Sequence, residues 1–168
     1  MGDDTNEWER RVAELWASID DHEPREFVAR MEQLTAERPA DDPDAVFERG
    51  ASLDSTGHSD LAIPLYREAL DHGLEGERRR RAVIQMASSL RNLGRAEESV
   101  VLLTGERKRQ SDHLDDAVSA FLALALADTG REREAVAIAL TALAPHLPRY
   151  QRSLGNYARL LTEDDDPT

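Results

Sequence analysis

Three glycines constrain the fold of this 168-residue chain more than any other feature. Gly57, Gly94 and Gly130 are 37 and 36 residues apart, and each stands between two stretches with helical apolar periodicity. Glycine suits a sharp chain reversal because it adopts backbone angles that other residues avoid. The spacing therefore predicts three tandem helix–turn–helix hairpins between about residues 43 and 149.

Residues of similar size return when the first hairpin is shifted by these two intervals. On the first helices, the shift aligns pairs that lie one helical turn apart: Gly50 and Leu53, Ala87 and Leu90, and Ala123 and Leu126. On the second helix of the first hairpin, Ala62, Tyr66 and Ala69 place a small, a large and a small residue on one face. Small residues at a helix crossing let the two backbones approach closely.

This pattern of small and large residues resembles the tetratricopeptide (TPR) repeat of bacterial TPR-type proteins. The resemblance implies an all-α fold, a right-handed α-solenoid of about eight or nine helices in antiparallel pairs, with N- and C-terminal capping helices. The chain departs from the family in three ways. Its spacing exceeds the usual 34 residues, the closing proline is missing from the three hairpins, and the family's tryptophan is replaced by Val46, Val83 and Ser119.

The breaks between periodic stretches predict how the chain is divided. Residues 1–42 are expected to form an N-terminal helix pair, with helices over 5–20 and from Pro24, as a degenerate repeat or cap. Three hairpins follow at 43–76, 80–113 and 116–149. Residues 150–162 are expected to form a C-terminal capping helix, and 163–168 an acidic, disordered tail.

Two aromatic residues and one acid allow more than one interpretation. Trp8 and Trp16 lie on an apolar helical stripe, which favours packing at the end of the solenoid over a cage for a cationic ligand. Glu106 replaces a small residue of the repeat, so either the second hairpin opens there or the glutamate reaches solvent. Most of the arginine run 78–81 is interpreted as a solvated, ion-paired surface and not as a phosphate site.

Charge and composition exclude several classes of partner. The formal net charge is −13, and it arises within the first 76 residues, which hold 20 acids and 7 arginines. Such a chain is repelled by phosphate backbones, so we expect no nucleic-acid partner and leave a basic or amphipathic protein open. The longest uncharged run, 135–148, is too short to span a bilayer. Without a signal peptide or any cysteine, the chain is expected to be cytoplasmic and not membrane-bound.

No constellation of residues predicts an enzyme. The chain lacks a glycine-rich phosphate loop, a His-Glu-x-x-His pair and a nucleophile elbow. The nearest approach to a metal cluster is Asp112, His113, Asp115 and Asp116, whose acids more simply cap a helix start. We therefore expect no catalytic residue, no metal and no cofactor.

A binding groove is the functional prediction. In tandem repeats of this kind the first helices line the concave side, so their residues away from the hairpin contact are candidates. A cationic and amide-bearing middle could hold a carboxylate or backbone carbonyls of a peptide, with apolar positions on either side. The candidate partner-binding residues are Phe47, Asp54, Arg81, Ile84, Gln85, Ser88, Arg91, Asn92, Phe121 and Leu124.

Two alternatives stay open at this point. Phe121 and Leu124 could be covered by the C-terminal helix, which would leave no continuous groove. The first functional class is a non-enzymatic interaction scaffold that binds a peptide or partner protein on its concave face. The second is a structural module that forms a homodimer through its apolar end helices, including Trp8 and Trp16.

Overall fold

The computed structural model describes residues 2–109 and 111–163, and side chains from Thr5 onward. All regular structure in these ranges is helical, which confirms the predicted all-α class. The α-helices are α1 (Gly2–Ala17), α2 (Pro24–Thr35), α3 (Pro43–Ser55), α4 (Ser59–Asp71), α5 (Gly76–Asn92), α6 (Ala96–Arg107), α7 (Asp115–Asp128), α8 (Glu132–Leu143) and α9 (Gln151–Glu163). Short 3-10 turns follow α1 and α8, at Ile19–Asp21 and Ala144–His146.

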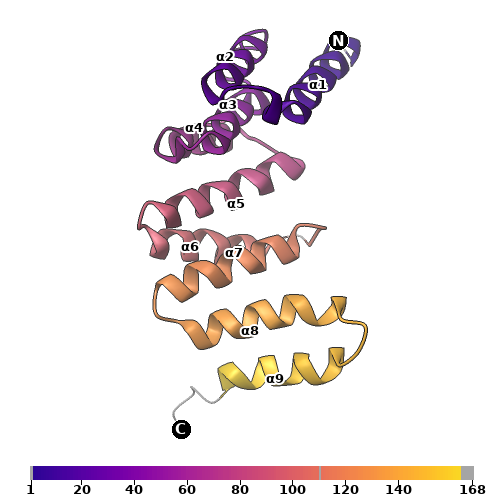
Figure 1. The fold of residues 1–168 in the computed structure, drawn as a ribbon, viewed down its shortest axis with the longest axis vertical. Helices are drawn as coiled ribbons and strands as arrows, with labels where there is room; N and C mark the ends of the chain where they lie inside the picture. The colour runs from indigo at the N-terminus through magenta and orange to yellow at the C-terminus, as the bar shows by residue number, and fades with distance from the viewer. Residues whose placement is uncertain (1, 110, 164–168) are drawn as a thin grey trace. The chain divides into compact units, whose positions relative to one another are not determined.

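The chain divides into two compact units, Met1–Ala82 and Val83–Thr168, and α5 runs through the boundary. In the first unit, α3 packs against α4 and α2, and α1 packs against α2. In the second unit, α6 packs against α7, α7 against α8, and α8 against α9. Figure 1 shows α7, α8 and α9 running back and forth as antiparallel neighbours.

The hairpin turns share one backbone geometry. Each turn glycine has a positive φ, which is 88° at Gly57, 76° at Gly94 and 77° at Gly130. In each turn, the amide N–H of the residue just before the second helix donates to the carbonyl oxygen five residues earlier, as in the Schellman motif. These bonds are His58 to Leu53, Arg95 to Leu90 and Arg131 to Leu126, at 2.9, 2.9 and 3.0 Å.

Close approach of two helices organises the first hairpin. A methyl group on Gly50 would lie 3.3 Å from the Tyr66 ring, a crowded contact, so glycine suits the close approach of α3 and α4. The Tyr66 ring is fully buried and lies 6.0 Å, centroid to centroid, from the Phe47 ring. Its hydroxyl donates to Asp54 Oδ2 at 3.2 Å. The predicted meeting of small and large residues is therefore present.

The same positions form the core of the second unit. Ala87 and Ala123 are buried at the places that correspond to Gly50. The position of Tyr66 is filled by Leu103, which is fully buried, and by Ala139, which is exposed. The cluster consists of Ile84, Ala87, Val100, Leu103, Val118, Leu122, Ala123, Ala125, Leu126, Ala135 and Ile138.

The N-terminal tryptophans take part in packing. Trp8 is 3% exposed, and its indole N–H donates to the Leu34 carbonyl oxygen at 3.0 Å, near the end of α2. The Trp16 ring lies 5.1 Å from the Phe27 ring, and its N–H donates to Glu48 Oε2 at 2.7 Å. The indoles thus join α1 to α2 and α3 within the first unit.

Three local expectations need correction. Glu106 does not reach solvent, because its side chain is only 4% exposed. Arg80 is likewise 4% exposed, so the arginine run is not a solvated surface throughout. The last helix begins at Gln151, since Tyr150 has a positive φ of 69° and lies outside the helix. The tail residues 164–168 fall outside the described residues, and the handedness of the solenoid stays a prediction.

We expect Tyr66→Ala to lower the free energy of unfolding by about 3–5 kcal/mol, because it opens a large cavity between α3 and α4. Tyr66→Phe removes only the hydroxyl bonded to Asp54 and should cost about 1 kcal/mol. Tyr157→Ala is the matched control, since this tyrosine is 67% exposed and its loss should stay within about 0.5 kcal/mol. Urea unfolding followed by circular dichroism measures all three, and equal losses for Tyr66→Ala and Tyr157→Ala would contradict the packing described.

Candidate functional site

The candidate residues of the first unit already contact other side chains of that unit. Phe47 is fully buried, and the Arg81 guanidinium lies 5.3 Å above its ring. Asp54 accepts hydrogen bonds from Ser59 Oγ at 2.8 Å and from the Tyr66 hydroxyl at 3.2 Å. Burial, and then the Asp54 charge, raise the pKa of the Tyr66 phenol, which keeps it a donor. These contacts leave no exposed Phe47 surface for a ligand.

A cluster of charged groups around Arg78 lies in the same unit. Arg78 Nε donates to Glu48 Oε1 at 2.8 Å, and its terminal nitrogens donate to the two Glu9 carboxylate oxygens at 2.8 and 2.6 Å. Asp44 lies 3.5 Å from the same guanidinium. Glu48 is 2% exposed and also accepts the Trp16 N–H. The guanidinium thus connects side chains of α1, α3 and α5.

The pKa shifts in this cluster follow from burial and charge. Burial acts to lower the pKa of Arg78, but its hydrogen bond to Glu9 and the charge of Glu48 outweigh this effect and raise the pKa. Burial raises the pKa of Asp44, and the nearby Arg78 charge offsets part of that increase. Arg78 therefore stays a cation, and the cluster holds helices together without the features of a reactive site.

The candidate residues on the second unit's part of α5 are mainly polar. Arg91 Nε lies 2.6 Å from Asp128 Oδ2 of α7, an ion pair without hydrogen-bond geometry. The Gln85 amide oxygen is buried and has no hydrogen-bond partner. Ser88 is half-buried and Asn92 is exposed, whereas Ile84 is 7% exposed and belongs to the core.

The apolar candidates lie on α7 and have counterparts on α9. Phe121 is half-buried and Leu124 is 46% exposed, so α9 does not cover them completely. A further shift of 36 residues reaches Tyr157 and Leu160, which are 67% and 45% exposed. We call Phe121, Leu124, Tyr157 and Leu160 the apolar stripe. The sequence analysis missed its α9 half, although the same repeat shift identifies both residues.

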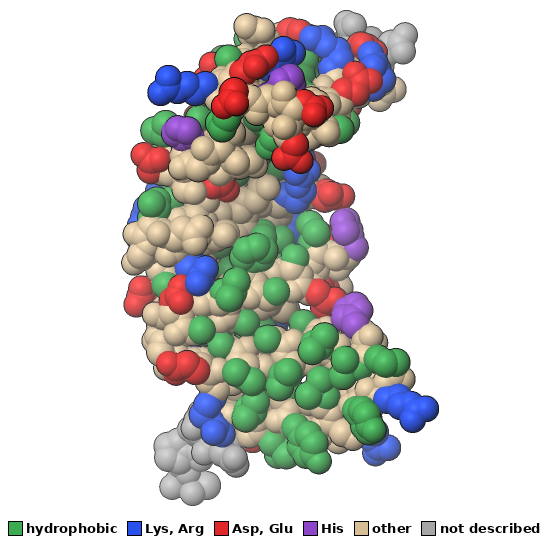
Figure 2. Space-filling view, viewed as in Figure 1, with side chains coloured by type: hydrophobic (Ala, Val, Ile, Leu, Met, Phe, Trp, Pro, Cys, Tyr) green, Lys and Arg blue, Asp and Glu red, His purple; other side chains and the backbone are tan. Residues whose placement is uncertain are grey.

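Tyr157 and Leu160 do not lie on the side of α9 where a hairpin partner would pack in a complete repeat. The residues of α9 that correspond to the buried Val118, Leu122 and Ala125 of α7 are Leu154, Ala158 and Leu161, which are buried or half-buried. Where α7 packs Ala123 and Leu126 against its hairpin partner, α9 instead carries Arg159 and Thr162, and both are exposed. Tyr157 and Leu160 lie on a third side. Figure 2 shows hydrophobic side chains gathered over α7, α8 and α9.

Metal sites and membrane-spanning helices are two further features that the described part of the chain could hold. Within it, no three His, Asp or Glu side chains are placed to hold a metal ion. Asp112 Oδ1 accepts the Leu114 N–H at 2.7 Å, and Asp115 Oδ1 accepts the Asp112 N–H at 3.3 Å, so both acids bind backbone near the start of α7. Among the helices described, none is long and apolar enough to cross a membrane.

Comparison with known proteins identifies the repeats. A family model described as tetratrico peptide repeat matches residues 43–161, from the first residue of α3 into α9. Comparison with curated proteins and with solved structures found no significant match.

We expect Arg78→Met to destabilise the protein by about 2–3 kcal/mol, because it leaves the Glu48 carboxylate buried without its main counter-charge. The loss of stability should be smaller than for a fully buried ion pair, since 21% of the Arg78 side chain is exposed. Adding Glu48→Gln should recover part of the loss in a double-mutant cycle. Arg10→Met, which removes only exposed ion pairs, is the control and should leave the urea midpoint unchanged. Additive effects of Arg78→Met and Glu48→Gln would contradict the coupling.

Proposed function

We propose that this chain, which belongs to the tetratricopeptide-repeat family, is a non-enzymatic interaction module that binds a peptide or partner protein along the apolar stripe. Repeats of this family generally mediate protein–protein interactions and are generally not catalytic. The proposal keeps the predicted residues Phe121 and Leu124 of α7, a first helix of a repeat, and extends the surface to Tyr157 and Leu160 of α9. The absence of cysteine favours action in the cytoplasm.

One observation carries the proposal. Two apolar residues one helical turn apart, the half-buried Phe121 and the exposed Leu124, lie on α7, and both residues at the same repeat positions of α9 are exposed. Leu124 and Leu160 are each about half exposed, and neither has a covering helix in the described chain. Exposed apolar side chains that follow a regular spacing on adjacent repeats suit the apolar side chains of a bound segment.

The polar residues of α5 could make polar contacts with the same ligand. Gln85 and Ser88 occupy the repeat positions of Phe121 and Leu124, so the stripe changes from apolar to polar along the second unit. The Gln85 amide oxygen lacks a partner, and a backbone N–H of an extended peptide could satisfy it after a side-chain rotation. Arg91 is already paired with Asp128, so a ligand carboxylate would have to compete there. We therefore propose a mainly apolar ligand segment with polar contacts at one end.

Self-association is the alternative function. Tyr150, Tyr157 and Leu160 are 76%, 67% and 45% exposed, and a second copy could cover them. The predicted contribution of Trp8 to such a homodimer is not supported, because that ring is buried within its own unit. Light scattering over a concentration series separates the alternatives, since a homodimer through α9 would lose mass on dilution and in a Leu160→Ser variant.

We expect the double variant Leu124→Ser, Leu160→Ser to weaken a ligand of the stripe by at least about tenfold, since each leucine contributes buried apolar area to the complex. The probe is a peptide selected by the purified chain from a random phage-displayed library, and fluorescence anisotropy measures its dissociation constant. Val101→Ser is the control, because Val101 is 72% exposed but lies on α6, a second helix of a hairpin. Equal affinity for the wild type and the double variant would exclude the stripe.

A further inference from the structure

An arginine occupies a core position of the repeat in the first hairpin. The shift of 37 and 36 residues aligns Arg49 with Met86 and Leu122. Met86 is 3% exposed and Leu122 is 2% exposed, and Leu122 belongs to the core of the second unit. Arg49 belongs to α3, which packs against the preceding helix α2, and Leu122 belongs to α7, which packs against the preceding helix α6. The first hairpin thus carries a cation where the other two carry buried apolar side chains.

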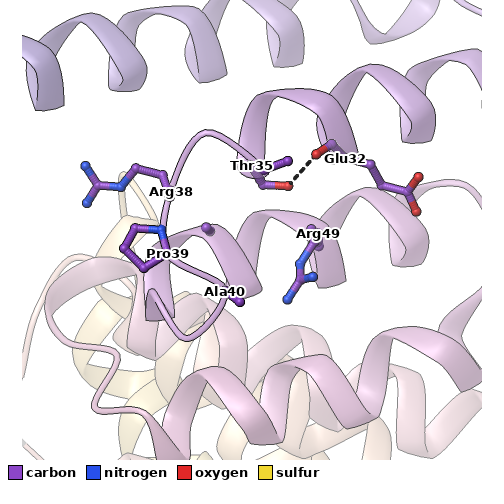
Figure 3. Close-up of a pocket in the computed structure, with 8 residues that line it drawn as sticks. Glu32, Thr35, Arg38, Pro39, Ala40 and Arg49 are labelled. Carbon is purple, nitrogen blue, oxygen red and sulfur yellow. Dashed lines mark hydrogen bonds between the residues drawn. The ribbon is translucent and has the colours of Figure 1, made fainter.

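A pocket of about 410 Å³ lies in front of this arginine, within the first unit. Its walls come from the last turn of α2, from the connection at Pro39 and Ala40, and from α3. Figure 3 shows the Arg49 side chain reaching from α3 toward Ala40, whereas the Arg38 guanidinium points away from it. Leu122 is buried by its neighbours, whereas α2 does not cover Arg49 on α3, and this leaves the pocket open.

Arg49 is the cation of this pocket that forms no ion pair with a described residue. Its Nε is buried without a hydrogen-bond partner, and no described residue forms an ion pair with its guanidinium. Arg38 is neutralised by Asp42, to which its Nε and a terminal nitrogen lie at 2.9 and 2.7 Å. The Thr35 hydroxyl is satisfied by the carbonyls of Met31 and Glu32. A buried guanidinium N–H without an acceptor is unfavourable, and a ligand oxygen would relieve it.

The chemistry of the walls indicates which anion fits. A planar guanidinium presents parallel donors that match the two oxygens of a carboxylate. Ala36, Ala40 and Ala45 leave room for small apolar groups beside that carboxylate. Glu32 also lines the pocket, and its negative charge would repel a doubly charged phosphate more strongly than a singly charged carboxylate.

We propose that the pocket between α2 and α3 binds one carboxylate group of a peptide, held by Arg49. The carboxylate is either a peptide C-terminus or an aspartate or glutamate side chain. This site lies in the first compact unit, apart from the residues of the apolar stripe, and so goes beyond the proposed function.

The test uses the full chain and three pools of N-acetylated random hexapeptides. One pool has a free C-terminal carboxylate and no acidic side chains, the second is amidated and contains aspartate and glutamate, and the third is amidated without acids. Retention on the immobilised protein is quantified by mass spectrometry. We expect retention of one or both acidic pools over the neutral pool, and the pool retained identifies the source of the carboxylate.

Arg49→Met is the decisive variant, because methionine occupies the corresponding core position in the second hairpin. We expect it to bind the best retained peptide at least about tenfold more weakly and to melt at the same or a higher temperature. Arg25→Met removes an exposed arginine of α2 and should bind as the wild type does. The Leu124→Ser, Leu160→Ser variant should also keep this affinity, which separates this site from the stripe. Equal retention of the three pools, or unchanged affinity in Arg49→Met, would overturn the proposal.

Discussion

The fold depends on how closely two helices of a hairpin can approach. In the first hairpin, the backbone at Gly50 lies against the Tyr66 ring, and a methyl group there would already be crowded. Ala87 and Ala123 take the same place in the second unit and are buried. In the first hairpin this contact holds α3 against α4, and the residues on the other sides of these helices are free to differ. The surface chemistry of the protein follows from those differences.

Three repeat positions illustrate this division between packing and surface. The position of Tyr66 is large in the first two hairpins but is Ala139 in the third, where the side chain is exposed. The position of Phe121 is polar in α5, at Gln85, and aromatic on α9, at Tyr157. Arg49 stands where its counterparts are buried apolar residues. Each departure from the repeat changes which side chains one face of a helix presents.

The features predicted correctly from the sequence are those that depend on residues close together in the chain. The turn glycines with positive φ, the helix pairs and the small-to-large contact all follow from spacing and residue size. The partners of charged side chains did not follow, because they depend on which helices meet in three dimensions. Glu48 pairs with Arg78, thirty residues away, although the run at 78–81 suggested a surface. Phe47 was expected to face a groove but is buried below Arg81, and periodicity alone does not separate these two faces of α3.

The Arg78 cluster also bears on where the folding unit of this chain begins. The family match starts at residue 43, yet on α1 Glu9 accepts two hydrogen bonds from Arg78 and Trp16 donates one to Glu48. A fragment cut at the start of the match would retain the buried carboxylate of Glu48 and lose its indole donor. The folding unit therefore extends N-terminal of residue 43 and includes α1, and an excised repeat array would be a poorer substitute for the whole chain than the family match suggests.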